Sequence, residues 1–117
     1  MRGVTLVKKI EVILRPNKMI ELEEALKDVV TGMTVTHVKG FGTQKGETQV
    51  YRGTPVTVNL LPKMKMETIV TDDKVEEFVG IIQRVCQTGK YGDGKIFIIP
   101  VEEAIRIRTG EKGHLAL

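Results

Sequence analysis

Residues 75–99 read VEEFVGIIQRVCQTGKYGDGKIFII and contain three patterns in succession. The first pattern predicts an amphipathic helix, because its apolar residues recur at helical spacing: Val75, Phe78, Val79, Ile82 and Val85. The second, TGKYGDGK, carries three glycines and is expected to end that helix. The third, residues 95–99, is an apolar run typical of a strand. A helix, a glycine-rich loop and a strand are therefore expected here.

Strand and helix patterns alternate through the rest of the chain. Upstream, apolar alternation over residues 10–14 predicts a strand that ends before Pro16, and a helical pattern follows it through Met19, Leu22, Leu26 and Val29, with Gly32 just beyond. Further strands are predicted at residues 33–39, at 56–68 with a bend at Pro62, and at 104–109. The order βαββαβ predicts an α+β fold of the ferredoxin-like type.

A long excursion separates the second and third predicted strands. Residues 40–55 contain five glycines or prolines and few apolar residues, and they are too many for an ordinary hairpin turn. Long irregular connections in compact domains are often functional, so we expect a functional loop here.

The glycine-rich segment resembles a phosphate-binding loop only in part. Gly89, Gly94 and Lys95 fit the pattern G-x-x-x-x-G-K, but Ile96 stands where a Ser or Thr hydroxyl should contact Mg²⁺. The context is also inverted, because a helix precedes the loop and a strand follows it. Glycines and lysines can still cradle an anion through backbone amides and charge. Two interpretations remain from the residues alone: a phosphate cradle, or a glycine-rich turn with solvated charges.

Two arginines beyond the loop add to the first interpretation. In a strand, Arg106 and Arg108 would project from one face, and two guanidiniums on one face suit a polyphosphate.

Composition excludes several classes of function. The chain has 117 residues, which favours one domain, and a net charge of +3 without a run of five like charges, so neither a nucleic-acid nor a membrane footprint is evident. It has no serine, one cysteine and two distant histidines, so no nucleophilic triad or zinc site is predicted. Cys86 is expected in the core. No signal peptide or membrane span is recognisable, and we expect an intracellular protein.

RNA recognition is the other function that a ferredoxin-like fold could suggest. Residues 39–42, KGFG, match the start of the RNP1 motif, but Thr43 and Gln44 break it, and the 4% aromatic content is too low to stack several bases. No nucleic-acid partner is expected.

Four separated blocks resemble the PII nitrogen-regulatory signal proteins, and the resemblance runs from Ile10 to about Gly113. The blocks are VKGFGTQKGETQVYRG, LPKMKMETIV, TGKYGDGKIF and RIRTGEKG. It implies a single PII-like domain over residues 1–117, with a T-loop at about 42–58, a B-loop at about 88–95 and a C-terminal segment at about 106–117. It also implies a cytoplasmic homotrimer that binds ATP or ADP between subunits and 2-oxoglutarate beside Mg-ATP.

The same resemblance implies the binding residues. Nucleotide would contact Ile13, Gly32, Thr34, Gly40, Phe41, Gly42, Gln44, Ile69, Thr88, Gly92, Asp93, Gly94 and Lys95, with Arg106 and Arg108 entering from the adjacent subunit. Gln44 would ligate Mg²⁺ together with ligand oxygens. The 2-oxoglutarate ligand would contact Gly42, Gln44, Lys45, Gly46, Lys63 and Gly92.

The resemblance implies a regulator, not an enzyme, which acts through its T-loop. Tyr51, Arg52 and Thr54 would contact the target, such as an ammonium transporter or a nitrogen-metabolism enzyme, and contact with a membrane would be only indirect, through the transporter. The sequence departs from the family pattern at two positions that concern ligand binding and regulation. Thr43 replaces a family arginine near the phosphates, and Val56 replaces the tyrosine that many bacterial members modify. The alternatives are a PII-like sensor of another small ligand, a trimeric scaffold or a slow ATPase.

Overall fold

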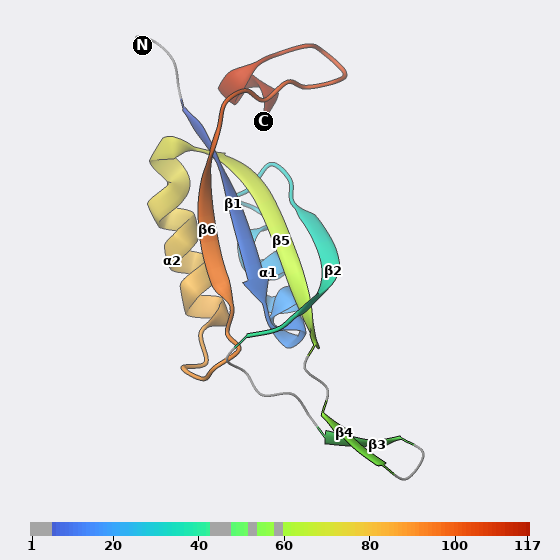
Figure 1. Ribbon diagram of the computed structural model, residues 1–117. Coiled ribbons are helices and arrows are strands. Elements are labelled where there is room, and N and C mark those ends of the chain that lie inside the picture. Colours follow the sequence, from blue (N-terminus) through green and yellow to red (C-terminus); the bar gives the residue numbers. More distant parts are fainter. Residues whose placement is uncertain (1–5, 43–47, 52–53, 58–59) are drawn as a thin grey trace.

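The computed structural model of the chain describes residues 6–42, 48–51, 54–57 and 60–117 (Figure 1). Four antiparallel strands form one sheet in the order β2-β5-β1-β6, and both helices lie on one face of it. The strands are β1 Val7–Leu14, β2 Thr34–Gly40, β5 Leu61–Thr71 and β6 Lys95–Val101, and the helices are α1 Met19–Leu26 and α2 Val75–Cys86. This arrangement confirms the predicted ferredoxin-like α+β fold.

The shorter elements are three 3₁₀ turns and a hairpin. The turns are η1 Pro16–Lys18, η2 Asp72–Lys74 and η3 Gly113–Ala116. The hairpin pairs β3 Thr48–Tyr51 with β4 Thr54–Thr57 and projects away from the sheet (Figure 1). This hairpin begins within residues 40–55, where a functional loop was expected. Val56 belongs to this hairpin, and the third strand of the main sheet begins later than predicted, at Leu61.

The strand predicted at residues 104–109 is wrong. Of that segment only Ile105 makes a bridge, to Lys112, and the Gly110 amide donates to the Arg106 carbonyl at 2.7 Å. Gly110 has a φ of 76°, a left-handed value that glycine adopts at little cost. The chain therefore reverses on itself here instead of extending along the sheet. The two arginines consequently do not project from one face of a strand.

The core lies between the sheet and the helices, where the predicted periodicities place it. Ile10, Leu14 and Leu26 are fully buried, and Ile82 of α2 meets them from the second helix. Burying such side chains stabilises the fold by about 1.5–3 kcal/mol each. Cys86 is buried as expected, and burial raises the pKa of its thiol to about 11. That thiol is therefore a core group and a poor nucleophile at neutral pH.

The opposite face of the sheet has no helix over it. Lys9 and Glu11 of β1 face Lys65 and Glu67 of β5, and the four make ion pairs of 3.0–3.6 Å. Phe97 and Ile99 of β6 flank these charges and remain 43% and 38% exposed. An uncovered sheet face that carries apolar side chains is typical of a surface on which another chain packs.

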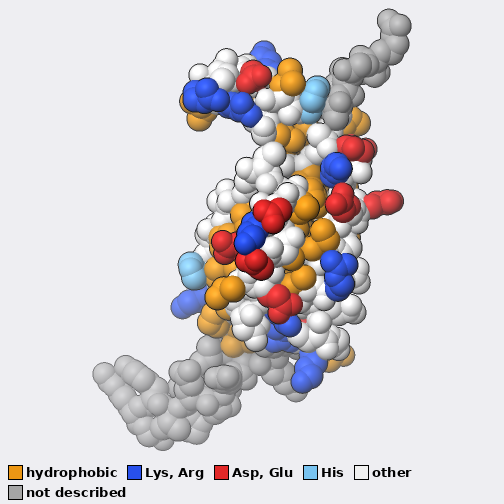
Figure 2. Space-filling model, turned by 180° about the vertical axis from the view of Figure 1, so that it is seen from behind, with side chains coloured by type: hydrophobic (Ala, Val, Ile, Leu, Met, Phe, Trp, Pro, Cys, Tyr) orange, Lys and Arg blue, Asp and Glu red, His pale blue; other side chains and the backbone are white. Residues whose placement is uncertain are grey.

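On the side of the molecule that carries the helices, charged side chains are scattered among apolar ones, as Figure 2 shows. Lys and Arg side chains also gather on the C-terminal segment, which lies at the end of the sheet where β6 finishes. Its basic residues are Arg106, Arg108 and Lys112.

Candidate functional site

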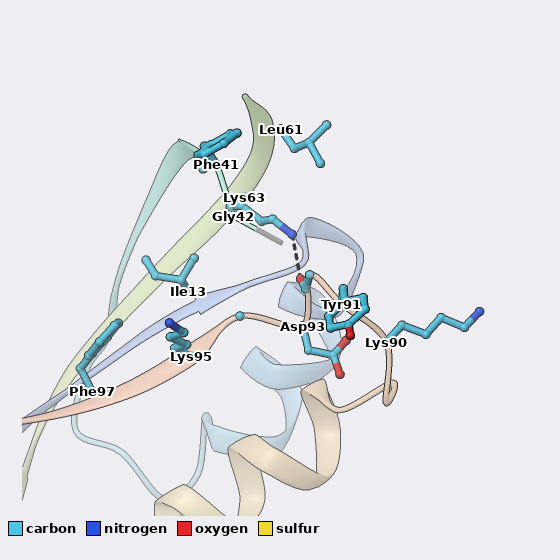
Figure 3. A pocket seen from close by; sticks show the side chains of 13 residues that line it. Ile13, Phe41, Gly42, Leu61, Lys63, Lys90, Tyr91, Asp93, Lys95 and Phe97 are labelled. Carbon is cyan, nitrogen blue, oxygen red and sulfur yellow. Dashed lines mark hydrogen bonds between the residues drawn. The ribbon is translucent and has the colours of Figure 1, made fainter. Parts of the chain in front are cut away.

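A cavity of about 540 Å³ opens at the end of the sheet opposite the C-terminal segment (Figure 3). Its walls come from the last residues of β1 and β2, the first residues of β5, the loop between α2 and β6, and the start of β6. The lining residues are Ile13, Gly40, Phe41, Gly42, Leu61, Lys63, Lys90, Tyr91, Gly92, Asp93, Gly94, Lys95 and Phe97. Most of the residues predicted to hold nucleotide or 2-oxoglutarate, among those that the structure describes, are thus brought together.

The loop between α2 and β6 has the backbone that the glycine pattern predicted. Gly89, Gly92 and Gly94 have φ values of 83°, 98° and 96°, in the left-handed region that other residues rarely adopt. At Gly94 the space is also restricted, since a Cβ would lie 1.7 Å from the carbonyl oxygen of Ile13. The loop therefore packs directly against the backbone of β1.

The Asp93 carboxylate organises this loop from within. One oxygen accepts hydrogen bonds from the Thr88 hydroxyl and from Arg15 Nε (3.1 Å), and the other accepts from the amides of Thr88 (2.8 Å) and Gly89 (2.9 Å). Arg15 also donates to the Tyr91 carbonyl at 2.6 Å. These bonds, chiefly those from Thr88, hold the pKa of Asp93 well below its ordinary value. The side chain of Asp93 is thus a positioning group for the loop.

This pKa shift predicts a pH-dependent stability. A carboxyl whose pKa is lower in the folded state stabilises the fold at pH values above its unfolded pKa, and that contribution is lost as the pH falls through and below the ordinary Asp value of 3.8. We expect Asp93→Asn to be less stable than the parent protein at pH 7 and the difference to narrow at pH 3. Urea unfolding of both proteins at the two pH values measures this. Asp28→Asn, a change at an exposed carboxylate, is the control, and an equal gap at both pH values contradicts the prediction.

Lys63 joins β5 to the same loop. Its amine donates to the Gly92 carbonyl at 2.7 Å, and the residue is only 9% exposed (Figure 3). Burial, and then the nearby Arg15 charge, lower the pKa of Lys63, whereas Asp93 opposes this shift. Lys63 lines the cavity, whereas Met64, the next residue of β5, enters the core. A cation at this position can neutralise a carboxylate or a phosphate in the cavity.

Other charged and aromatic groups stand at the cavity's edge. Lys90 and Lys95 line it and are exposed, as are Phe41 and Tyr91, at 74% and 78%. Together with Lys63, these lysines can offset several negative charges in the cavity. Among the described residues, no three His, Cys, Asp or Glu side chains could together hold a metal ion.

A second group of predicted residues lies at the other end of the sheet. In β1, Ile13 pairs with Lys95, whereas Ile69 pairs with Lys9, four residues or about 13 Å along that strand. Ile69 lines a separate cavity of about 290 Å³ with His114 and Leu117. The other members of this group are Gly32, whose carbonyl accepts from the buried Thr68 hydroxyl at 2.6 Å, Thr34 at the start of β2, and Arg106 and Arg108. No single copy of the chain brings both groups together.

Several predictions fall on residues that the structure does not describe. Gln44, Lys45, Gly46 and Arg52 lie outside the described residues, so their roles stay predictions. Tyr51 and Thr54 lie on β3 and β4, where they pair with each other.

Sequence reasoning missed some residues of the site, Arg15 above all. Arg15 follows β1 directly and precedes Pro16, and its partner Asp93 lies 78 residues further along the chain. Only the antiparallel pairing of β1 with β6 brings them together. Tyr91, Leu61 and Phe97 were also not predicted to line the cavity, whereas Lys90 was expected to add charge to the loop. No helix in the described part of the chain is long and apolar enough to cross a membrane.

Comparison with known proteins gives a consistent result over nearly the whole chain. Residues 7–111 match the family model described as nitrogen regulatory protein P-II. The chain is 54% identical over 112 residues to nitrogen regulatory protein P-II of Pasteurella multocida and to nitrogen regulatory protein P-II 1 of Escherichia coli K12, and each match covers 95% of this chain and 100% of the relative. A solved structure of Bacillus subtilis GlnK superposes with a TM-score of 0.79 at 36% identity, covering 97% of this chain and 100% of that one.

Proposed function

The chain belongs to the P-II family of nitrogen regulatory proteins, and we propose that it is a cytoplasmic signal protein that binds ATP or ADP in the 540 Å³ cavity. The observation that carries this proposal is the loop of residues 88–95. Two of its left-handed glycines, Gly92 and Gly94, line the cavity. Lys63, Lys90 and Lys95 line it as well, and the walls add apolar surface from Ile13 and Phe97. Such a site suits a ligand with an apolar ring and several phosphates.

We propose a homotrimer because the predicted site is divided between the two ends of one chain. Placing the end that carries Arg106 and Arg108 against the cavity of another copy completes the site, and the uncovered sheet face supplies a surface for that packing. The neighbouring subunit then contributes Gly32, Thr34, Ile69, Arg106 and Arg108 to each nucleotide.

The proposed second ligand, 2-oxoglutarate, lies beside Lys63 and Gly92 and also contacts Gly42, Gln44, Lys45 and Gly46. Lys63 already donates to the Gly92 carbonyl, so its cationic head is directed at the glycine loop, where a carboxylate of the ligand can accept from it. Magnesium would offset part of the negative charge of the nucleotide phosphates and of the keto acid. Because the described residues hold no metal-binding cluster of their own, the fitting donors are ligand oxygens with the Gln44 amide oxygen.

The position of the long excursion explains how ligands could regulate a target. Gly40, the last residue of β2, pairs with Leu61, the first residue of β5, and both line the cavity. The two sheet residues that flank the long excursion therefore lie at the proposed ligand site. A ligand that contacts Gly40 and Leu61 differently in two arrangements of the T-loop shifts the population toward the arrangement that it binds more tightly. We propose that Tyr51, Arg52 and Thr54 then present or withdraw a docking surface for an ammonium transporter or a nitrogen-metabolism enzyme.

Catalysis is not supported by the chemistry of the cavity. Asp93 is the one carboxylate among the described lining residues, and its oxygens already accept bonds from Arg15, Thr88 and Gly89. A carboxylate with a lowered pKa that is saturated with donors is a poor general base. We therefore propose a regulator and not an ATPase.

Isothermal titration tests the ligand scheme. We expect Mg-ATP to bind the parent protein, and 2-oxoglutarate to bind only when Mg-ATP is present. Lys63→Ala is expected to weaken 2-oxoglutarate binding by about 10-fold or more, because a charge-assisted hydrogen bond is lost.

The control for that titration is Lys39→Ala, which removes an exposed lysine whose partner Pro62 precedes Lys63 on the neighbouring strand. It should leave both ligands unaffected. Absence of ATP binding to the parent protein contradicts the proposed function, and 2-oxoglutarate binding that does not need ATP contradicts the proposed order.

A further inference from the structure

The guanidinium of Arg106 is already occupied by groups of its own C-terminal segment. Its Nη1 donates to Glu111 Oε1 at 3.2 Å, and its Nη2 donates to the backbone oxygen of Leu117 at 2.6 Å. Both terminal nitrogens of the fork are thus engaged. These are the nitrogens with which arginine grips a phosphate in a bidentate manner.

The surrounding backbone holds this arrangement in place. The Arg106 amide donates to the Glu111 carbonyl at 2.9 Å, and Ile105 bridges to Lys112. The Glu111 carboxylate is fixed in turn by Thr109, whose hydroxyl donates to the same Oε1 at 2.9 Å while accepting from the Glu111 amide at 3.2 Å. Hydrogen bonds from Thr109 and from the backbone therefore hold the Glu111 carboxylate at the Arg106 guanidinium, in addition to the attraction between their charges.

Arg108 offers a contrast within the same turn. It is exposed, and in the described part of the chain it has no ion pair. Of the two arginines predicted to reach a nucleotide on a neighbouring subunit, only Arg106 carries a bound carboxylate.

We propose that Glu111 is an internal competitor for the nucleotide phosphates at Arg106, an inference that rests on the proposed function. The Glu111 carboxylate occupies Nη1 of the Arg106 guanidinium, and a phosphate must displace it before both terminal nitrogens can bind that phosphate. Glu111 thereby lowers the affinity for nucleotide. Because the competition is between negative groups, its effect is larger for ligands with more phosphate charge.

The test compares Glu111→Gln with the parent protein by isothermal titration with ATP and with ADP. Glutamine retains the shape of the side chain but removes its charge, and an exposed ion pair is worth little, so the expected gain in ATP affinity is about two- to fivefold. The gain should be smaller for ADP and should shrink at high salt, because salt screens exposed charges. A purely structural effect of the substitution would change both nucleotides alike.

The matched control is Glu102→Gln, which removes an exposed glutamate just beyond β6. It should leave the affinity unchanged. Unchanged affinity in Glu111→Gln overturns the inference alone, and weaker affinity overturns it too, since Glu111 would then be positioning Arg106 for phosphate. Absence of ATP binding to the parent protein, Glu102→Gln and Glu111→Gln alike overturns the inference together with the proposed function.

Discussion

Gly94→Ala is expected to lower the free energy of unfolding by about 3–5 kcal/mol, because the substitution introduces backbone strain and a steric clash together. The φ of 96° already disfavours any side chain at this position. The added Cβ would also lie 1.7 Å from the Ile13 carbonyl oxygen and 2.7 Å from its carbon. Both atoms are backbone in the sheet, so no change of rotamer relieves the overlap. Urea unfolding at a fixed protein concentration measures the loss.

Gly89→Ala is the matched control for that experiment. Gly89 has a similar φ of 83°, but nothing lies within 4 Å of the position that an alanine methyl group would take, so only the strain of about 1–2 kcal/mol remains. Gly32→Ala, at an unstrained and open position, should change stability by less than either. Equal losses for Gly94→Ala and Gly89→Ala would show that the close approach of the loop to β1 contributes nothing.

The same contact shows what the sequence could and could not predict of the fold. The periodicities of α2 and β6 and the glycines between them predicted a helix, a loop and a strand, because each pattern is local. The Ile13 carbonyl that makes glycine obligatory at position 94 lies 81 positions earlier in the chain, and no local pattern indicates it. Likewise, alternation of Ile105 and Ile107 predicted a strand, but the turn closed at Gly110 and the ion pair of Arg106 with Glu111 prevail over it.

The candidate site also contains some residues that the sequence indicated and some contacts that it did not. Glycines and lysines near one another in the sequence singled out the loop of residues 88–95, and the family resemblance added Lys63, which lies against that loop from another strand. The Arg15–Asp93 contact was missed because it depends on the register of β1 with β6. The separation of Arg106 from the cavity follows from topology, since β6 carries the chain from one end of the sheet to the other.

The separation of Arg106 from the cavity predicts that two variants, each of which binds ATP weakly, restore binding when they are combined. Lys95 lines the cavity, whereas Arg106 lies beyond the far end of β6. In the homotrimer that we propose, the two phosphate contacts of one site therefore come from different subunits. Lys95→Ala alone and Arg106→Ala alone are each expected to weaken ATP binding by about 10- to 100-fold, because each removes a charge-assisted hydrogen bond. In a homotrimer of either variant, every site lacks the same contact.

A trimer that contains chains of both variants has sites that differ in which of Lys95 and Arg106 they keep. When chains of the two variants assemble in a ring of three, one of the interfaces places the intact Lys95 of one chain against the intact Arg106 of the other, and another interface lacks both. We expect unfolding and refolding of an equimolar mixture to produce a fraction of sites with the affinity of the parent protein, measured by titration with ATP. Each variant refolded alone is the control and should recover none. If the refolded mixture binds ATP no better than its two components, Lys95 and Arg106 do not meet across a subunit boundary, because a site built within one chain cannot be repaired by a neighbour.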